Sequence, residues 1–205
     1  MSDRLTLELA NKHDISVKRV KNCQTLYGAI ERFRCDRWSG DRWNDIESRR
    51  MITRFFYEVT WNYKTGFFTP NALKVKHSTT LTTKQKNKQS TSDHVLSGQA
   101  YGTFAIGTFD KDGDPDLGLD KLIHHVKTAS QTIECTHREN IEFKKITENN
   151  ESTGGKLKIK VPADKRYEAS GITKLWDDNN GRYIEGCPIL LSDEFLEFQS
   201  KELLI

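Results

Sequence analysis

The chain contains no long hydrophobic run. No segment approaches the roughly 20 apolar residues that a membrane-spanning helix needs, and the first residues, Met-Ser-Asp-Arg-Leu, lack the apolar core of a secretory signal peptide. Hydrophobic residues make up only 35% of the 205 residues, but four tryptophans, ten phenylalanines and six tyrosines are enough to build a core, so disorder is not expected. We expect a soluble, cytoplasmic protein with no membrane partner.

Cysteine is scarce and widely spaced. The four cysteines form no Cys-x-x-Cys motif; they are Cys23, Cys35, Cys135 and Cys187. A disulfide framework or a structural zinc site needs closer spacing. We therefore expect reduced, mostly buried thiols and no bound zinc, which excludes nucleases whose fold depends on a Cys₄ zinc site.

Acidic residues are absent from one long stretch. Between Val59 and Ser92 the chain has no aspartate or glutamate but has six lysines. Residues 1–90 hold 18 lysines and arginines against 9 acidic residues, whereas residues 91–205 hold 14 against 20. A basic half joined to an acidic half is typical of a polyanion-binding surface beside a site rich in carboxylates, and ordinary surface patchiness is the alternative.

These shifts in composition divide the chain into three predicted regions. Residues 1–78 form a helical, basic nucleic-acid-binding region, residues 79–92 a basic polar loop, and residues 93–205 an α+β, catalytic-like region, with one integrated domain as the alternative. The loop is rich in Thr, Gln, Asn, Ser and Lys. Its candidates for contacts with a nucleic-acid backbone are Lys84, Lys86 and Lys88. A simple linker is the alternative.

The N-terminal region is expected to begin with two helices. Residues 5–10 carry apolar side chains at helical spacing, a turn follows at 11–14, and Ser16 is an N-cap candidate for a helix that continues to about Phe33. The pattern resembles a helix-turn-helix. Its second helix would present three basic residues to phosphates or base edges: Lys18, Arg19 and Lys21. Two packed helices with solvated basic side chains are the alternative.

The segment 32–54 is dense in arginine and contains two tryptophans. Arginine forks match phosphate oxygens, and indole rings stack on bases or bury against the scaffold. Neighbouring acidic residues offer surface ion pairs as the alternative. The residues at helical spacing are the better candidates for backbone contacts: Arg49, Arg50 and Arg54.

The pair Asp93-His94 follows the acid-free stretch directly and precedes apolar residues. Adjacent acid and imidazole groups supply a metal ligand and a general base from consecutive positions. Hydrolysis of a phosphodiester uses both, because a divalent cation neutralises phosphoryl charge and an imidazole activates water. A surface histidine with satisfied hydrogen bonds is the alternative.

The rest of the chain predicts an α+β fold. Residues 110–116 start like a calcium loop, but Pro115 stands where the loop needs glycine and Lys121 where it needs glutamate, so we interpret them as an acidic surface turn. We expect an amphipathic helix at 119–129, a strand at 132–136, a hairpin around 177–181 and a closing helix at 193–203. The expected class is α+β, with a helical basic N-terminal region, small antiparallel strands and a closing C-terminal helix.

At Asp93-His94 and over residues 140–149 the sequence resembles the HNH (ββα-metal, His-Me finger) endonucleases, of phage or restriction type. That family places an Asp-His or His-His pair at the end of a first strand. An Asn follows in the pattern Asn-Leu-x-x-Leu, and about nine residues later a His or Asn stands on a short helix. Here the pair is matched by Asp93-His94, the pattern by Asn140-Ile141-Glu142-Phe143 and the last position by Asn149. The resemblance covers roughly a quarter of the chain and implies a central ββα-metal-like motif.

The resemblance also implies roles for these residues. His94 would be the general base, Asn140 would orient it, and Asp93 and Asn149 would bind one Mg²⁺ or Mn²⁺ ion that stabilises the phosphoryl charge. The gap from His94 to Asn140 is about three times that of a compact motif, so the helix at 119–129 must be an insertion. The zinc-binding cysteines of many members are missing.

Two positions of the motif have an alternative residue in this sequence. Asn150 is the alternative to Asn149, and His137 is the alternative to Asn140. The implied activity is metal-dependent endonuclease cleavage of DNA, with RNA as the alternative substrate. A homodimer is expected if both strands of a palindrome are cut. The alternative function is a phage-like, non-catalytic nucleic-acid-binding or regulatory protein that uses the Arg/Trp region and the lysine loop. A third is a protein-interaction factor whose basic half docks on an acidic partner.

Overall fold

The computed structural model describes residues 3–34, 46–96, 101–102, 104–105, 118–147 and 161–202. It confirms the α+β class, because helices accompany a five-stranded mixed sheet and a helix closes the described part of the chain. The chain divides into two compact units. The helical unit comprises residues 1–61 and 101–130, and the sheet unit comprises residues 62–100 and 131–205.

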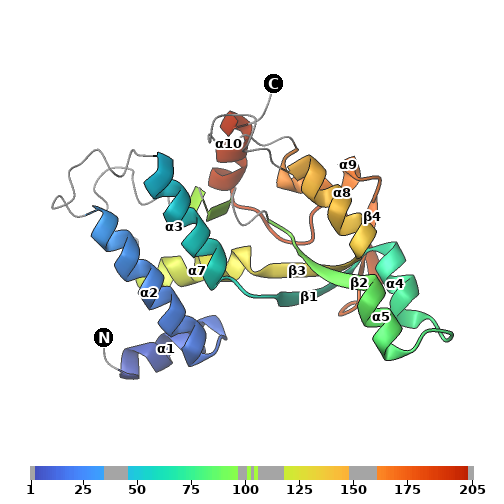
Figure 1. Cartoon of the computed structure of the whole chain (residues 1–205), viewed down its shortest axis with the longest axis horizontal. Coiled ribbons are helices and arrows are strands. Elements are labelled where there is room, and N and C mark those ends of the chain that lie inside the picture. The colour runs from blue at the N-terminus through green and yellow to red at the C-terminus, as the bar shows by residue number, and fades with distance from the viewer. Residues whose placement is uncertain are drawn as a thin grey trace. The chain divides into compact units, whose positions relative to one another are not determined.

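The helical unit is built around its second helix. Its longer described helices are α1 (Asp3–His13), α2 (Val17–Arg34), α3 (Ile46–Val59) and α7 (Leu119–Ala129) (Figure 1). α2 contacts each of the other three. Its inward face carries four fully buried side chains at helical spacing: Val20, Cys23, Leu26 and Ile30. Full burial of an aliphatic side chain contributes about 1.5–3 kcal/mol.

The turn between α1 and α2 is closed by two backbone hydrogen bonds. The Asp14 amide donates to the Asn11 carbonyl at 3.2 Å, and the Ile15 amide donates to the Ala10 carbonyl at 3.0 Å. This is the Schellman pattern, whose residue after the helix adopts a left-handed conformation. Asp14 adopts it with a φ of 51°. The two helices that the sequence predicted around 11–14 are therefore confirmed.

The end of α1 is also attached to α7. Lys12 Nζ lies 2.8 Å and His13 Nε2 2.9 Å from the two carboxylate oxygens of Asp120. Lys127 Nζ donates to the His13 carbonyl at 2.6 Å. Hydrogen bonds from Lys12 and His13 lower the pKa of Asp120. The helix predicted at 119–129 has these bounds in the structure, and its inward side chains include Leu122, Ile123 and Val126.

The sheet unit holds the strands of the described residues. They are β1 (Tyr63–Phe68), β2 (Ser90–His94), β3 (Gln131–Thr136), β4 (Lys174–Asp177) and β5 (Arg182–Glu185). The strand order is β2-β3-β1-β4-β5. β1 and β3 are parallel, and the other neighbours are antiparallel. The predicted hairpin around 177–181 joins β4 to β5. Asp177 closes this turn by accepting the amides of Asn179 and Asn180.

Helices surround this sheet in the sheet unit. They are α4 (Pro70–His77), α5 (Thr83–Gln89), α8 (His137–Thr147), the 3-10 turn η3 (Ala163–Lys165), α9 (Arg166–Ala169) and α10 (Asp193–Glu202) (Figure 1). The closing helix predicted at 193–203 is α10, and the Phe195 amide donates to Ser192 Oγ at its start.

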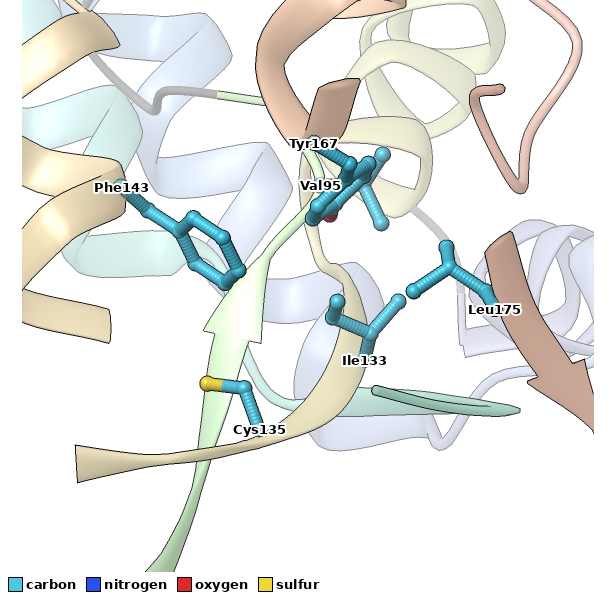
Figure 2. Packing of buried hydrophobic residues seen from close by; sticks show 6 residues of the cluster. All are labelled: Val95, Ile133, Cys135, Phe143, Tyr167 and Leu175. Carbon is cyan, nitrogen blue, oxygen red and sulfur yellow. The ribbon is translucent and has the colours of Figure 1, made fainter. Parts of the chain in front are cut away.

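The core of the sheet unit lies on one face of the sheet. Figure 2 shows side chains from β3, β4, α8 and α9 meeting there. The cluster consists of Val95, Ile133, Cys135, Phe143, Tyr167 and Leu175. The Phe143 and Tyr167 rings meet edge to face, with centroids 5.2 Å apart. We call this side of the sheet the core face, and the other side the outer face.

The loop predicted over 79–92 is wrong in its central part. The chain there forms α5 and then enters β2. Thr82 and Gln85 make a capping box: Thr82 Oγ1 accepts the Gln85 amide, and Gln85 Oε1 accepts the Thr82 amide. The Thr-x-x-Gln spacing satisfies the first backbone donors of a short helix. The prediction of a loop considered only the polar composition of this segment and missed the helix. The two units also interleave in sequence, unlike the predicted regions 1–78, 79–92 and 93–205.

Several predicted features lie outside the described residues. They are the acidic turn at 110–116, Cys35, Trp38 and Trp43, Asn149 and Asn150. The side chains of Arg49 and Arg50 belong to the same group, although their backbone is part of α3. Cys23 and Cys135 are free and buried, and Cys187 is free and half-buried.

Candidate functional site

The predicted catalytic residues belong to one ββα unit. β2 pairs antiparallel with β3, and α8 starts directly after β3 and packs on both strands. α7 interrupts the sequence between the two strands, as the long gap predicted. Asp93 and His94 end β2, and Asn140 lies in the first turns of α8. The chain order of the expected motif is therefore present.

Asp93 and His94 point to opposite faces of the sheet. They pair in register with Ile133 and Thr132 of β3, and successive residues of a strand alternate between faces. Ile133 belongs to the core cluster, so Asp93 lies on the core face. His94 lies half-buried on the outer face. The strand geometry therefore separates the predicted metal ligand from the predicted general base.

Asp93 forms a buried ion pair with Arg166 of α9. Arg166 Nη2 donates to Asp93 Oδ1 at 3.1 Å and lies 3.0 Å from Oδ2, and the two side chains are 4% and 7% exposed. Arg166 Nη1 donates to the carbonyls of His94 and Val95. The guanidinium carbon is 5.2 Å from the centroid of the Phe143 ring. This one arginine therefore joins α9 to the end of β2.

A metal ion does not fit at Asp93 in this arrangement. Burial raises the pKa of the Asp93 carboxyl, and the Arg166 guanidinium opposes part of that rise. The Arg166 guanidinium already supplies the positive charge that a metal ion would supply. A metal ion at Oδ2 would lie next to this guanidinium and would be repelled by it. Oδ2 has no hydrogen bond with good geometry, so its chemistry suits a cation, but its charge environment does not.

Asn140 is the other predicted residue with an unusual environment. Its Oδ1 is buried and has no hydrogen-bond partner in the described part of the chain. Asn140 lies one helical turn before Phe143, whose ring packs in the core cluster, so the two share a side of α8. His137, the alternative to Asn140, is exposed at the start of α8. The predicted ligand Asn149 and its alternative Asn150 lie outside the described residues.

Glu139 is a structural residue that the sequence interpretation missed. Its Oε2 accepts hydrogen bonds from the Thr136 amide and the Thr136 hydroxyl, both at 2.8 Å, and the Glu139 amide donates back to Thr136 Oγ1. The carboxylate also accepts from Thr69 Oγ1 and Asn71 Nδ2 around the start of α4. The Thr-x-x-Glu spacing at 136–139 was the available signal. No local signal could have pointed to Arg166.

The basic residues predicted on α2 have different environments. Lys18 and Lys21 are exposed, as expected. Arg19 is half-buried, and its guanidinium carbon lies 4.3 Å from the centroid of the Trp61 ring. Arg19 therefore packs against Trp61 within the helical unit through a cation–π contact. The sequence did not distinguish it from its two neighbours.

The outer face of α2 forms a longer stripe than the sequence indicated. The exposed residues at helical spacing are Lys18, Lys21, Thr25, Gly28 and Arg32. We call them the α2 stripe. No acidic residue occurs from Ile15 to Ile30. A Cβ atom added at Gly28 would meet nothing within 4 Å. Packing in the described structure therefore does not require glycine there, although glycine costs a helix roughly 0.5–1 kcal/mol relative to alanine.

The other predicted nucleic-acid contacts lie on α3 and α5. Arg54 is exposed on α3, and Lys84 and Lys88 are exposed on α5. Lys86 is half-buried and donates to the Lys76 carbonyl at 2.8 Å, so it joins α5 to α4. Three of these four cations therefore face solvent in the described structure.

Comparisons with known proteins identify no relative: no family model, no curated protein and no solved structure matches the chain. Among the described residues, no three side chains of the His, Cys, Asp and Glu types gather as a metal site would require. No helix in the same part of the chain is both long enough and apolar enough to span a membrane.

Proposed function

We propose that the protein binds duplex nucleic acid through the α2 stripe. The observation that carries the proposal is an exposed helical face with three cations, no acidic residue and an open glycine. Lysine and arginine on one helix face neutralise phosphates and release their counterions. α1, the Schellman turn and α2 form the helix-turn-helix order in which a second helix approaches the groove.

Gly28 sharpens the proposal. The helix interior would be more stable with alanine, and nothing in the described structure fills the space beside Gly28. A partner that approaches the helix backbone closely explains the glycine, because a Cβ atom would hold that partner away. The same substitution should therefore strengthen the fold and weaken binding.

The test is fluorescence anisotropy with a labelled DNA duplex at several salt concentrations. Replacing Lys18 and Lys21 by alanine should weaken binding and lower the salt slope by roughly 1 for each phosphate that the variant no longer neutralises. The matched control is Lys165→Ala, which removes an exposed lysine from η3 of the sheet unit. If the double variant binds the duplex like the wild type at every salt concentration, the α2 stripe is not the binding surface.

A second candidate function is endonuclease activity in the ββα unit. It is supported by the chain order β2-β3-α8, with Asp93-His94 at the end of the first strand and Asn140 on the helix. In this reading His94 accepts the proton of the attacking water, and Asp93 with Arg166 holds the end of β2 in place.

Plasmid nicking tests the second candidate. Scission that requires Mg²⁺ or Mn²⁺, stops with EDTA and disappears in His94→Ala would establish the nuclease. His124→Ala is the matched control, because His124 is an exposed histidine of the helical unit. Equal scission by His94→Ala would remove His94 from the reaction, and absence of scission with duplex binding intact would leave the binding function alone.

A further inference from the structure

The outer face of the sheet carries a row of aromatic rings. Phe68 pairs in register with Trp176, and Trp176 pairs with Tyr183, so the three residues lie side by side on β1, β4 and β5. Leu175 and Ile184 flank this row in sequence and belong to the core face. Because strand residues alternate, the three rings lie on the outer face. We call them the aromatic row.

Part of this row is open to solvent. Tyr183 is 45% exposed, and Phe68 and Trp176 are half-buried. The Trp176 and Tyr183 rings meet at 69° with centroids 5.2 Å apart. The cross-strand contact between these two rings stabilises the β4–β5 pair, but it leaves almost half of the Tyr183 surface exposed to solvent.

Lysines stand at both ends of the row. Lys174 Nζ lies 4.5 Å from the centroid of Tyr183, and Lys76 Nζ lies 4.3 Å from the centroid of Phe68. Lys76 belongs to α4, which packs against β1 and β4 and also contacts α5. The other exposed lysines of these two helices are Lys74, Lys84 and Lys88, within a stretch that has no acidic residue.

Two of the acidic groups near the row form ion pairs with lysines. Glu134 accepts Lys64 Nζ at 3.0 Å, and Asp178 accepts Lys76 Nζ at 2.7 Å. Glu185 stands opposite Lys174 on the neighbouring strand. The excess positive charge therefore comes from α4, which places Lys76 beside Phe68, and from its neighbour α5.

We propose that the aromatic row and the lysines of α4 and α5 bind a single-stranded nucleic acid, with bases stacked on the rings and phosphates beside the lysines. A platform of aromatic rings with adjacent cations is the combination that unpaired bases use, since every base offers a π-face. An acidic peptide would use the lysines but would gain nothing from stacking. The proposal does not rest on duplex binding by α2, because the two surfaces belong to different units.

The experiment compares two fluorescein-labelled strands of equal length, oligothymidine and its abasic analogue, which has the same phosphates and no bases. The wild type should bind oligothymidine more tightly than the abasic strand. Tyr183→Leu should weaken oligothymidine binding roughly 10- to 100-fold and leave abasic binding unchanged. Tyr183→Phe keeps the ring and should keep the preference. The matched control is Tyr57→Leu, which removes a similarly exposed ring, 50% exposed, from α3.

Three results would overturn the proposal: no binding of oligothymidine by the wild type, equal binding by Tyr183→Leu, or equal losses for both strands. Thermal unfolding of each variant, followed by circular dichroism, shows that the fold is retained. The duplex assay on the same Tyr183→Leu sample separates this proposal from the first, because the α2 stripe is unchanged in it.

Discussion

The α2 stripe and the Asp93–Arg166 pair use the same kinds of charged side chain in opposite ways. Lys18 and Lys21 are exposed to solvent, whereas Arg166 is buried and donates hydrogen bonds to one carboxylate and two carbonyls. An exposed charge costs little to keep and stays available to a partner. A buried charge must find its partners inside the protein, so it is committed to the fold.

The comparison predicts its largest effect at Arg166. Arg166→Met removes the cation and leaves the Asp93 carboxylate buried without it, so the free energy of unfolding should fall by roughly 3–5 kcal/mol. Urea unfolding followed by circular dichroism measures the change. Lys21→Met makes the same replacement on the α2 stripe and should stay within about 0.5 kcal/mol of the wild type.

A double variant sharpens this result. Asp93→Leu combined with Arg166→Met removes both charges, and much of the lost stability should return because no buried charge is left alone. If Arg166→Met alone unfolds like the wild type, the ion pair does not hold α9 to β2.

A half-buried polar group, His125 of α7, extends the comparison to pH. Burial, with smaller effects of His124 and Lys121, lowers the pKa of His125 to about 4. The Tyr101 hydroxyl lies 3.0 Å from His125 Nδ1. The unfolded chain binds the proton more readily, so stability is complete above about pH 6.5 and falls as pH drops toward 4, by at most about 3 kcal/mol.

Urea unfolding between pH 7 and 4 measures this loss. His125→Gln should flatten the pH dependence in that window, because it removes the titrating group. His124→Gln replaces an exposed histidine one residue away and should keep the wild-type slope. Equal slopes in all three proteins would contradict a His125 that stays neutral in the folded protein.

The Schellman turn predicts a smaller effect of opposite sign. Asp14 has a φ of 51°, a conformation that costs a residue with a Cβ atom about 1–2 kcal/mol. Asp14→Gly relieves this cost but adds freedom to the unfolded chain, so we expect a gain of about 1 kcal/mol in thermal or urea unfolding. A loss of stability would show that the Asp14 side chain makes a contact more valuable than the strain.

The smallest expected change in stability is at Gly28. Gly28→Ala should stabilise the helical unit by roughly 0.5–1 kcal/mol, because the added Cβ meets no atom within 4 Å. If the α2 stripe contacts a duplex closely, the same variant should bind that duplex more weakly. Higher stability together with unchanged binding would mean that no partner approaches this glycine.

Local patterns in the sequence predicted several elements well. The helices around α1, α2, α7 and α10 follow from apolar residues at helical spacing, and the β4–β5 hairpin follows from a polar turn. The ββα order also follows from the chain, including the inserted helix. The α5 helix was missed because its residues bury nothing and form a helix through the Thr82–Gln85 capping box.

The candidate site was less predictable because its partners are distant in sequence. Asp93 attracted attention as a metal ligand, and its partner Arg166 comes 73 residues later on another element. The aromatic row combines Phe68 with two residues more than 100 positions away, and only the strand order β1-β4-β5 makes them neighbours.

The sequence by itself determined several of the helices, the hairpin turn, the basic stretch without acidic residues and the position of Asp93-His94 at the end of a strand. These features depend on periodicity, composition and local capping, which neighbouring residues control. The tertiary structure alone decided which charges are exposed, which face of the sheet each side chain occupies and which ring lies beside which. Such choices depend on strand register and burial, and residues far apart in the chain set both.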